Sequence, residues 1–237
     1  MNIHTTIIEK GRLVRGNKFL GNINLSDVSW PPENRYQAAI SVAPKKGKRV
    51  LDVGCGNGTV LYNLRERFDE LHGIELTHDQ ADWAKKTLSD CGKSVNIRIG
   101  DIESGCTYPD NYFDYVVMAD VIEHIFNVRK AISDLVRVTV PGGLVCICTP
   151  NIAYIRRRLK LLFGCFPMTS NEKFLIQENE LIDGGHIHYL TFEDLCFLLR
   201  SYGTTRKVGY GHLFNLLRIW PAMFASGACV CLTKNMK

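Results

Sequence analysis

The sequence predicts a doubly wound α/β fold with a mostly parallel sheet. From residue 48 onward, short apolar runs alternate with longer stretches of helical spacing, and a glycine-rich turn follows the first run. Strands that alternate with helices are joined by right-handed crossovers and therefore pair in parallel. Hydrophobic residues make up 46% of the 237 residues and charged residues 22%. This composition suits a domain with a sizeable core and excludes disorder, collagen and a disulfide-stapled mini-protein.

The predicted elements follow one another along the chain in this alternation. Strands are expected at Arg49–Val53, His72–Leu76, Asn96–Ile99, Tyr115–Ala119 and Leu144–Thr149. Helices are expected, because apolar residues recur there at helical intervals, at Thr59–Phe68, Asp79–Cys91 and Ile132–Val138. A last buried strand is expected at Ala228–Thr233.

Two regions lie outside the alternation. Residues 1–47 form a predicted N-terminal cap segment, in which a turn at Trp30–Glu33 leads into a helix near Tyr36–Val42. Residues 48–237 form the predicted domain, and residues 152–190 are a long insertion after its fifth strand. An excursion of this length at the carboxyl edge of a parallel sheet usually covers a binding crevice, so we expect the insertion to be a lid.

Charge and cysteine usage restrict the partners and the compartment. Lys+Arg 29 against Asp+Glu 24 gives a net charge of +5. The sequence has no basic stripe interleaved with aromatic residues, so no nucleic-acid partner is expected. The nine cysteines form no C-x-x-C pair, so we expect free thiols in a reducing cytoplasm. Cys146/Cys148 and Cys229/Cys231 lie in apolar runs, where a thiol behaves as a small core hydrophobe.

Two stretches of the chain bear on targeting and membrane insertion, the first residues and an apolar segment near the C-terminus. The first residues lack the apolar region of a signal peptide. The stretch Leu213–Leu232 carries one charge, Arg218, but Pro221 and Gly227 interrupt it. We expect it to be an apolar helix or loop that feeds the last strand rather than a membrane-spanning helix.

The most informative segment is VLDVGCGNG, residues 50–58. A strand runs directly into Gly54-x-Gly56-x-Gly58, and a helix follows at once. The glycines permit a tight turn and a close approach of a ligand to the backbone, and the helix N-terminus offers free N–H groups. Glu75 lies at the end of the second strand, where a carboxylate can accept both hydroxyls of a ribose. Its loss is therefore expected to weaken cofactor binding and to leave folding almost unchanged.

These residues resemble the class I S-adenosylmethionine-dependent methyltransferases, which have a Rossmann-like seven-stranded fold. VLDVGCGNG is similar to their first motif, and HGIEL (72–76) supplies the ribose-binding glutamate. GDI (100–102) matches the strand end that contacts adenine, FDYVVMADVIEH (113–124) the fourth motif, and PGGLVCI (141–147) the turn into the fifth strand. The resemblance covers Arg49 to Thr149 without a gap.

The resemblance implies S-adenosylmethionine as the cofactor and S-adenosylhomocysteine as the product. It implies cofactor-binding roles for Asp52, Gly54, Cys55, Gly56, Gly58, Glu75, Leu76, Asp101, Ile102, Asp120 and Val121. Asp52 is expected near the ammonium of the amino-acid end, and Asp101 near the adenine amino group. The absence of phosphate-binding Lys or Ser residues near the loop agrees with a cofactor that has no pyrophosphate.

Catalytic candidates follow the fourth strand and end the insertion. We expect Glu123, His124 and His186 to face the methyl donor, with His124 or His186 as a general base for a hydroxyl acceptor. The alternative for Glu123-His124 is that the pair only caps the following helix. His186 and His188 alternate along an extended segment and should point to opposite faces, so only His186 is expected at the substrate.

A divalent metal is a second option for this group. Asp120-x-x-Glu123-His124 with the distal His186 resembles the E-x-x-E-H arrangement of small-RNA 2′-O-methyltransferases and of quinone-biosynthesis O-methyltransferases. A metal there would lower the pKa of a hydroxyl. This chain has Asp120 where those families have Glu, so the metal ligands stay unassigned.

The insertion points to particular subfamilies. Its PN strand end, its RRRLKLLFG helix (156–164) and the segment ELIDGGHIHYLT (180–191) resemble methyltransferases encoded among cell-surface polysaccharide genes and, in part, MetW-like proteins. The resemblance implies a small-molecule or glycan-type hydroxyl as the acceptor. The alternative is a MetW-like regulatory partner that binds the cofactor without turnover. The basic helix is interpreted as a solvated face or as a peripheral membrane contact.

Overall fold

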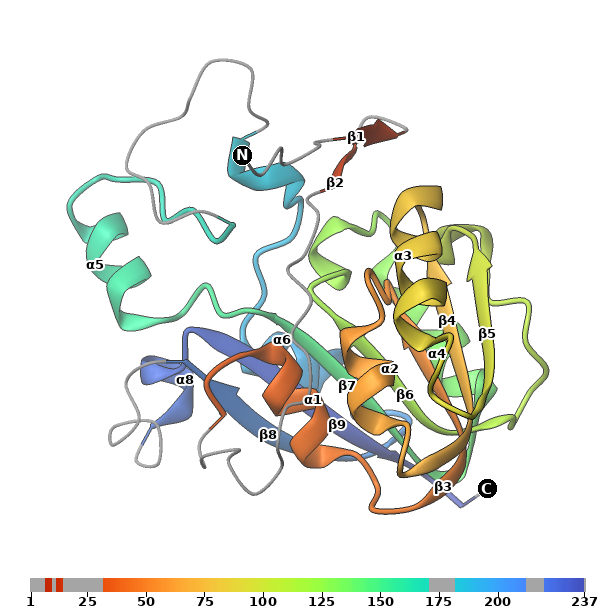
Figure 1. Cartoon of the computed structure of the whole chain (residues 1–237). Coiled ribbons are helices and arrows are strands. Elements are labelled where there is room, and N and C mark those ends of the chain that lie inside the picture. Colours follow the sequence, from red (N-terminus) through yellow and green to blue (C-terminus); the bar gives the residue numbers. More distant parts are fainter. Residues whose placement is uncertain (1–6, 10–11, 15–31, 171–181, 212–219, 237) are drawn as a thin grey trace.

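The computed structural model describes residues 7–9, 12–14, 32–170, 182–211 and 220–236. In this part of the chain a seven-stranded sheet has the order β5-β4-β3-β6-β7-β9-β8 (Figure 1). Its strands are β3 (Gly47–Val53), β4 (Phe68–Glu75), β5 (Ser94–Ile99), β6 (Phe113–Ala119), β7 (Thr139–Pro150), β8 (Gly203–Tyr210) and β9 (Gly227–Lys234). Strands β3 to β7 pair in parallel, whereas β9 is antiparallel to β7 and β8. The predicted mostly parallel, doubly wound sheet is confirmed.

Helices cover both faces of this sheet and create two separate core layers. On one face lie α1 (Arg35–Val42), α2 (Thr59–Leu64) and α3 (His78–Leu88), and on the other lie α4 (Val128–Val138) and α6 (Phe192–Leu199). Because β3 and β6 are buried on both faces, consecutive apolar residues occur in each, Val50-Leu51 in β3 and Tyr115–Met118 in β6. Leu51 of β3 contributes to one layer and its neighbour Val50 to the other.

The remaining elements are short. β1 (Ile7–Glu9) and β2 (Arg12–Val14) form an antiparallel pair, and α5 (Ile155–Leu162) follows β7. Three turns of 3-10 helix are η1 (Ile102–Ser104), η2 (Ile122–His124) and η3 (Ile182–Gly185), and α8 (Pro221–Phe224) precedes the last strand. The turns η1 and η2 each begin soon after a parallel strand ends, and this places their residues at the carboxyl edge of the sheet.

Two predicted boundaries were wrong for one reason. The helix expected at Thr59–Phe68 ends at Leu64, and the strand expected from His72 already begins at Phe68. Phe68 has helical spacing from Leu61 and Leu64, but its ring is fully buried beside Gly47, its partner in the β3–β4 ladder. A Cβ atom at Gly47 would lie 2.5 Å from Phe68 Cε1, so the glycine makes room for this ring.

The C-terminal part contains two elements that the periodicity did not predict, α6 and β8. Thr191 and Asp194 form a capping box at the start of α6, with the Thr191 side chain accepting from the Asp194 N–H at 3.2 Å. At the other end of the chain, α1 starts after Asn34, whose side chain accepts from the Gln37 N–H at 3.0 Å. Trp30 and Pro31 of the predicted turn lie outside the described residues.

The apolar stretch near the C-terminus contains α8 and β9 where it is described. Its residues 213–219 lie outside the described part, and β9 is the buried strand expected at Ala228–Thr233, one residue longer at each end. Among the helices of the described residues, none combines the length and the apolar character that crossing a membrane requires.

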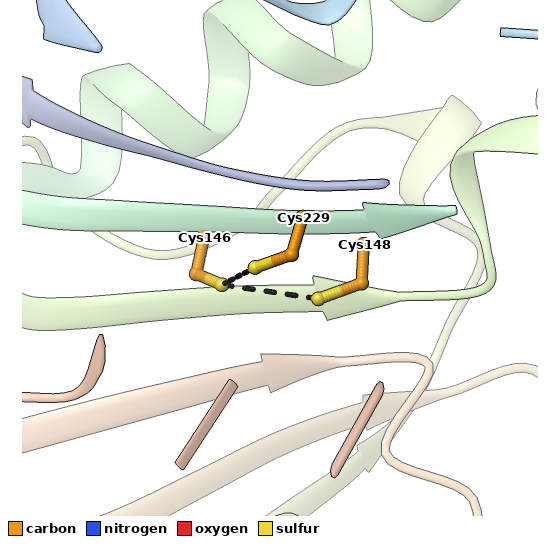
Figure 2. Close-up of side chains that lie close together, drawn as sticks. All are labelled: Cys146, Cys148 and Cys229. Atoms are coloured by element: carbon orange, nitrogen blue, oxygen red, sulfur yellow. Dashed lines mark hydrogen bonds between the residues drawn. The ribbon is translucent and has the colours of Figure 1, made fainter. Parts of the chain in front are cut away.

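Three thiols meet in the core under α1 (Figure 2). Cys146 and Cys148 project from β7 and Cys229 from β9, and all three are fully buried. The Cys146 and Cys229 sulfur atoms are 3.3 Å apart. Contacts with both neighbouring thiols, together with burial, raise the pKa of the Cys148 thiol well above its usual value. The sequence interpretation of these residues as small core hydrophobes agrees with this burial.

Candidate active site

A cavity of about 380 Å³ opens at the carboxyl edge of the sheet. The ends of five parallel strands contribute to its wall: Gly54 follows β3, Glu75 ends β4, Asp101 follows β5, Asp120 follows β6 and Pro150 ends β7. Ligands of doubly wound sheets bind in this position, outside the carboxyl ends of the strands.

The glycine loop forms one side of the cavity through two of its three glycines. Gly54, Gly56 and Gly58 all have positive φ, at 74°, 51° and 82°, a region in which residues with a side chain are strained. Gly54 and Gly56 line the cavity, and a Cβ atom at Gly54 would lie 2.3 Å from Cγ2 of Val121. Gly58 instead caps α2, and Cys55 is buried behind the loop.

Glu75 lines the cavity and also holds the glycine loop in place. One carboxylate oxygen accepts from the Gly56 N–H at 2.8 Å, and the other accepts from the N–H groups of Leu76 at 2.9 Å and Thr77 at 3.2 Å. The side chain is almost fully buried. The expectation that its loss would leave folding unchanged is therefore corrected, because these buried donors would lose their acceptor.

The neighbouring strand ends complete this half of the cavity. Leu76, Asp101 and Ile102 all line it, as does Gln80 from α3. Asp101 caps η1, with Oδ1 accepting from the Glu103 N–H at 3.0 Å. The cap fixes the position of the Asp101 carboxylate at the cavity wall.

Asp52 lies beneath the cavity lining, whereas the sequence predicted that it would lie beside the ammonium of the cofactor. It belongs to β3, is nearly inaccessible, and does not contribute to the cavity wall. Burial, followed by the negative charge of Glu75, raises the pKa of Asp52 to about 8. Arg35 opposes this shift, because its positive charge favours the ionised carboxylate.

The pair Asp120–Arg35 joins the start of α1 to the end of β6. Asp120 has a positive φ of 53°, and its Oδ2 accepts from the Arg35 guanidinium at 2.6 Å. Tyr210 of β8 donates to the other oxygen at 3.4 Å. Asp120, Val121 and Arg35 all line the cavity. The sequence did not point to Arg35, because it lies far along the chain from Asp120, the residue it pairs with.

The three catalytic candidates come together. His124 and His186 line the cavity with their rings edge to face and 4.7 Å between centroids, and Glu123 is buried behind them. His186 Nε2 lies 3.9 Å from Glu123 Oε1, and the other oxygen of Glu123 accepts from the Thr149 hydroxyl at 3.1 Å. Burial, and then the charge of Asp120, raise the pKa of Glu123 well above its usual value.

A chain of hydrogen bonds orients His186. The Thr169 hydroxyl donates to Oδ2 of Asp183 at 2.6 Å, so its oxygen accepts from His186 Nδ1, also at 2.6 Å. Asp183 is fully buried and accepts from the N–H groups of Thr169 and Ser170. Burial raises the pKa of Asp183, but these hydrogen bonds outweigh it and lower the pKa overall. The arrangement places a proton on Nδ1, and in the neutral form of the ring Nε2 is then the acceptor.

The described ends of the insertion line the cavity and are held there by backbone bonds. Its residues Thr169, Ser170, Gly184 and His186 line the cavity, and the Glu123 carbonyl accepts from the N–H groups of Ile187 and His188. The His188 ring donates to the Ile125 carbonyl at 2.9 Å and does not line the cavity. His186 and His188 thus point in different directions, as their alternation predicted. Residues 171–181 of the predicted lid lie outside the described residues.

Strand order, glycine loop and strand-end acid together define a class I S-adenosylmethionine-dependent methyltransferase domain. Residues 33–205, well over half of the chain, match the family described as "Methyltransferase domain", and the chain belongs to this family. S-adenosylmethionine is the cofactor of this class, as the sequence predicted.

Relatives and solved structures agree with this family. The chain is 34% identical over 134 residues to a ubiquinone biosynthesis O-methyltransferase of Dechloromonas aromatica, covering 56% of this chain and 54% of that protein. It is 34% identical over 117 residues to a probable tocopherol O-methyltransferase of Oryza sativa, covering 48% of this chain and 32% of that protein. The chain spans about half the length of the curated relatives it matches first.

Among solved structures, the YcgJ protein of Bacillus subtilis superposes with a TM-score of 0.61 at 14% identity, covering 85% of this chain and 98% of that one. A methyltransferase of Methanosarcina mazei superposes with a TM-score of 0.57 at 20% identity, covering 83% and 96%. At these identities the likeness shows the shared fold.

The raised pKa of Asp52 predicts a pH-dependent penalty on folding. Between 3.8 and about 8 the unfolded chain loses the Asp52 proton while the folded protein keeps it, so this group lowers stability as pH rises through that range. Asp52→Asn removes the titration. The difference in melting temperature between the variant and the wild type should therefore increase with pH across this range and level off above it. Parallel curves for the two proteins would contradict the shift.

The bonds of Glu75 predict a combined loss of stability and cofactor binding in Glu75→Ala. Each buried N–H left without an acceptor costs about 1–3 kcal/mol, and we expect a similar loss, about 1.5–3 kcal/mol, in affinity for S-adenosylmethionine. Urea denaturation and calorimetric titration measure the two effects. Glu75→Gln keeps one acceptor oxygen and should lose less stability. A stable Glu75→Ala variant with unchanged cofactor affinity would contradict both roles.

Proposed function

We propose that the protein transfers the methyl group of S-adenosylmethionine to a hydroxyl of a small molecule. The observation that carries this proposal is the position of His186. It lines the same cavity as Glu75 and the glycine loop, and Thr169 and Asp183 orient it so that Nε2 can accept a proton.

In this proposal the strand-end residues hold the cofactor. Glu75 binds the ribose hydroxyls, Asp101 and Ile102 contact the adenine, and Gly54 and Gly56 let the amino-acid end approach the backbone. Asp52, buried below the cavity lining, acts on the ammonium by its charge, and Asp120 and Val121 line the cavity, Val121 directly beside Gly54. The positive φ of the loop glycines and the buried carboxylates fit a ligand with a ribose and a cationic end. When bound, S-adenosylmethionine supplies an electrophilic methyl group on a sulfonium centre.

The chain's own contribution to catalysis is positioning and proton removal. As the acceptor oxygen attacks, His186 takes the hydroxyl proton on Nε2, and the Thr169–Asp183 chain stabilises the resulting imidazolium. His124 donates from Nδ1 to the Gly185 carbonyl, 3.2 Å away, which gives it the same tautomer beside His186. His186 is the base in this proposal and His124 is the alternative, and Glu123 is buried behind both rings.

A base role for His186 predicts a selective loss of turnover. His186→Ala should lower kcat about 10²–10⁴-fold while cofactor affinity stays nearly intact. Formation of S-adenosylhomocysteine, measured by mass spectrometry with catechols, hydroquinones and sugars as acceptors, gives the rate. His188→Gln, which changes a histidine outside the cavity lining, is the matched control and should stay within tenfold of the wild type. Equal losses in the two variants would remove His186 from the mechanism.

The acceptor class rests on the relatives and on the lid. Two relatives are named as O-methyltransferases of ubiquinone biosynthesis and of tocopherol, which favours a ring hydroxyl; the insertion motifs favour a glycan-type hydroxyl. A MetW-like regulatory partner would bind the cofactor and release no S-adenosylhomocysteine with any acceptor. The proposal also keeps residues 1–47 as a cap on the domain at 48–237, because Arg35 reaches the cavity from there. The nine unpaired cysteines suit a cytoplasmic location.

A metal-assisted reaction is the second candidate, and one observation favours it. Ligand atoms of Glu123, His124 and His186 all lie within 4.8 Å of one another, and Glu123 Oε1 is buried without a hydrogen-bond partner among the described residues. A divalent cation bound there would lower the pKa of the acceptor hydroxyl.

Metal dependence gives a separate expected outcome. If the cation is required, a chelator should abolish turnover, and added Mg²⁺ or Mn²⁺ should restore it, while cofactor affinity stays unchanged. Full activity after extensive chelation would leave the histidines as bases alone.

A further inference from the structure

The helix α5 and the segment that follows it expose an unusual amount of apolar surface. No residue of α5 is buried, and in Figure 1 the helix lies apart from those that cover the sheet. Leu161, Leu162 and Phe163 are 64%, 75% and 78% exposed, and Leu159 and Phe166 are also exposed. We call residues 155–166 the α5 platform. Five large apolar side chains in so short a segment exceed the isolated exposed hydrophobes of an ordinary surface.

The charges on the α5 platform have one sign. Residues 152–170 include Arg156, Arg157, Arg158 and Lys160 but no acidic residue. Arg156 and Arg158 are exposed, so their positive charge lies beside the apolar side chains. Arg157 has a different role: it donates to the carbonyls of Asn151 and Ser226, each at 2.7 Å, and fixes the helix to the end of the sheet.

The exposed apolar side chains and the positive charges of the α5 platform together favour one kind of partner. A solvated helix face would carry the cations without the exposed leucines and phenylalanines, and a second copy of the platform would bring like charges together. An anionic lipid surface satisfies both features, because its head groups attract the guanidinium groups while the apolar side chains enter the boundary of the acyl chains. We propose that the α5 platform docks on the surface of an anionic lipid bilayer.

Docking would bring the cavity close to the bilayer. Only residues 167 and 168 separate the platform from Thr169 and Ser170, which line the cavity. The proposal does not depend on methyl transfer, because the features that carry it lie outside the cavity. Failure of either proposal can therefore be distinguished from failure of the other.

Co-sedimentation of the full chain with vesicles tests the proposal. The protein should sediment with vesicles of equal parts phosphatidylcholine and phosphatidylglycerol, and binding should weaken with added salt and with pure phosphatidylcholine. Arg156→Glu/Arg158→Glu should lower vesicle affinity more than about tenfold. Leu161→Ser/Leu162→Ser/Phe163→Ser should lower it similarly, because the apolar anchor is lost. Both variants alter exposed side chains, so melting temperature and cofactor affinity should match those of the wild type.

Lys85→Glu/Lys86→Glu is the matched control, since it makes the same change of charge on exposed residues of α3. This control should sediment like the wild type. No sedimentation of the wild type with anionic vesicles would overturn the proposal. So would an equal loss in the control and the Arg156→Glu/Arg158→Glu variant, which would indicate attraction by net charge alone. A dimer in solution that the triple serine variant dissociates would assign the platform to a second copy and overturn membrane docking.

Discussion

The hydrogen bond between the Glu75 carboxylate and the Gly56 N–H joins the end of β4 to the glycine loop, and the cavity depends on this connection. The loop leaves β3 with three positive φ angles, and the N–H groups of Gly54 and Cys55 already donate to the Ile74 carbonyl of β4. Glu75 adds an acceptor for the Gly56 N–H from the end of β4, and its other oxygen fixes the start of α3 through the Thr77 N–H. The cavity wall, the first helix after the loop and the second helix therefore share one buried anchor.

Burial of acidic groups gives the site its electrostatic character. Asp52, Glu75 and Glu123 are all buried near the cavity, and Arg35 is the cation that pairs with Asp120 beside them. Carboxyl groups in this environment keep protons that they would lose in water, as the raised pKa values of Asp52 and Glu123 show. A cationic ligand would relieve this excess of acid, which explains in physical terms why a sulfonium compound with an ammonium group suits the cavity.

The sequence predicted the parts of the structure that local patterns determine. The five parallel strands, the last strand, the glycine loop and Glu75 follow from patterns along the chain, and the structure and the family match confirmed the fold class and the family. The end of α2 could not be predicted from periodicity, since Phe68 fits the helical spacing and is used by a strand through its contact with Gly47. Arg35 and the Asp183–Thr169 chain were not identified, because each joins segments whose meeting depends on the tertiary fold. In the sequence, Arg35 is marked only as a polar residue at the start of a helix. Asp183 is marked only by the LIDGGH pattern, which does not indicate its role.

The insertion begins and returns at the same place, because the Ile152 N–H donates to the Leu190 carbonyl at 3.2 Å. Asn151, just before it, binds the carbonyls of Ala222 and Ala225 and secures the point of departure. A loop whose two ends are already joined can change in length at little entropic cost, since closure depends only weakly on the number of residues enclosed. This junction gives the domain a site at which evolution can exchange one recognition segment for another while the cofactor half stays intact. Sequence divergence among relatives should therefore be concentrated between Ile152 and Leu190.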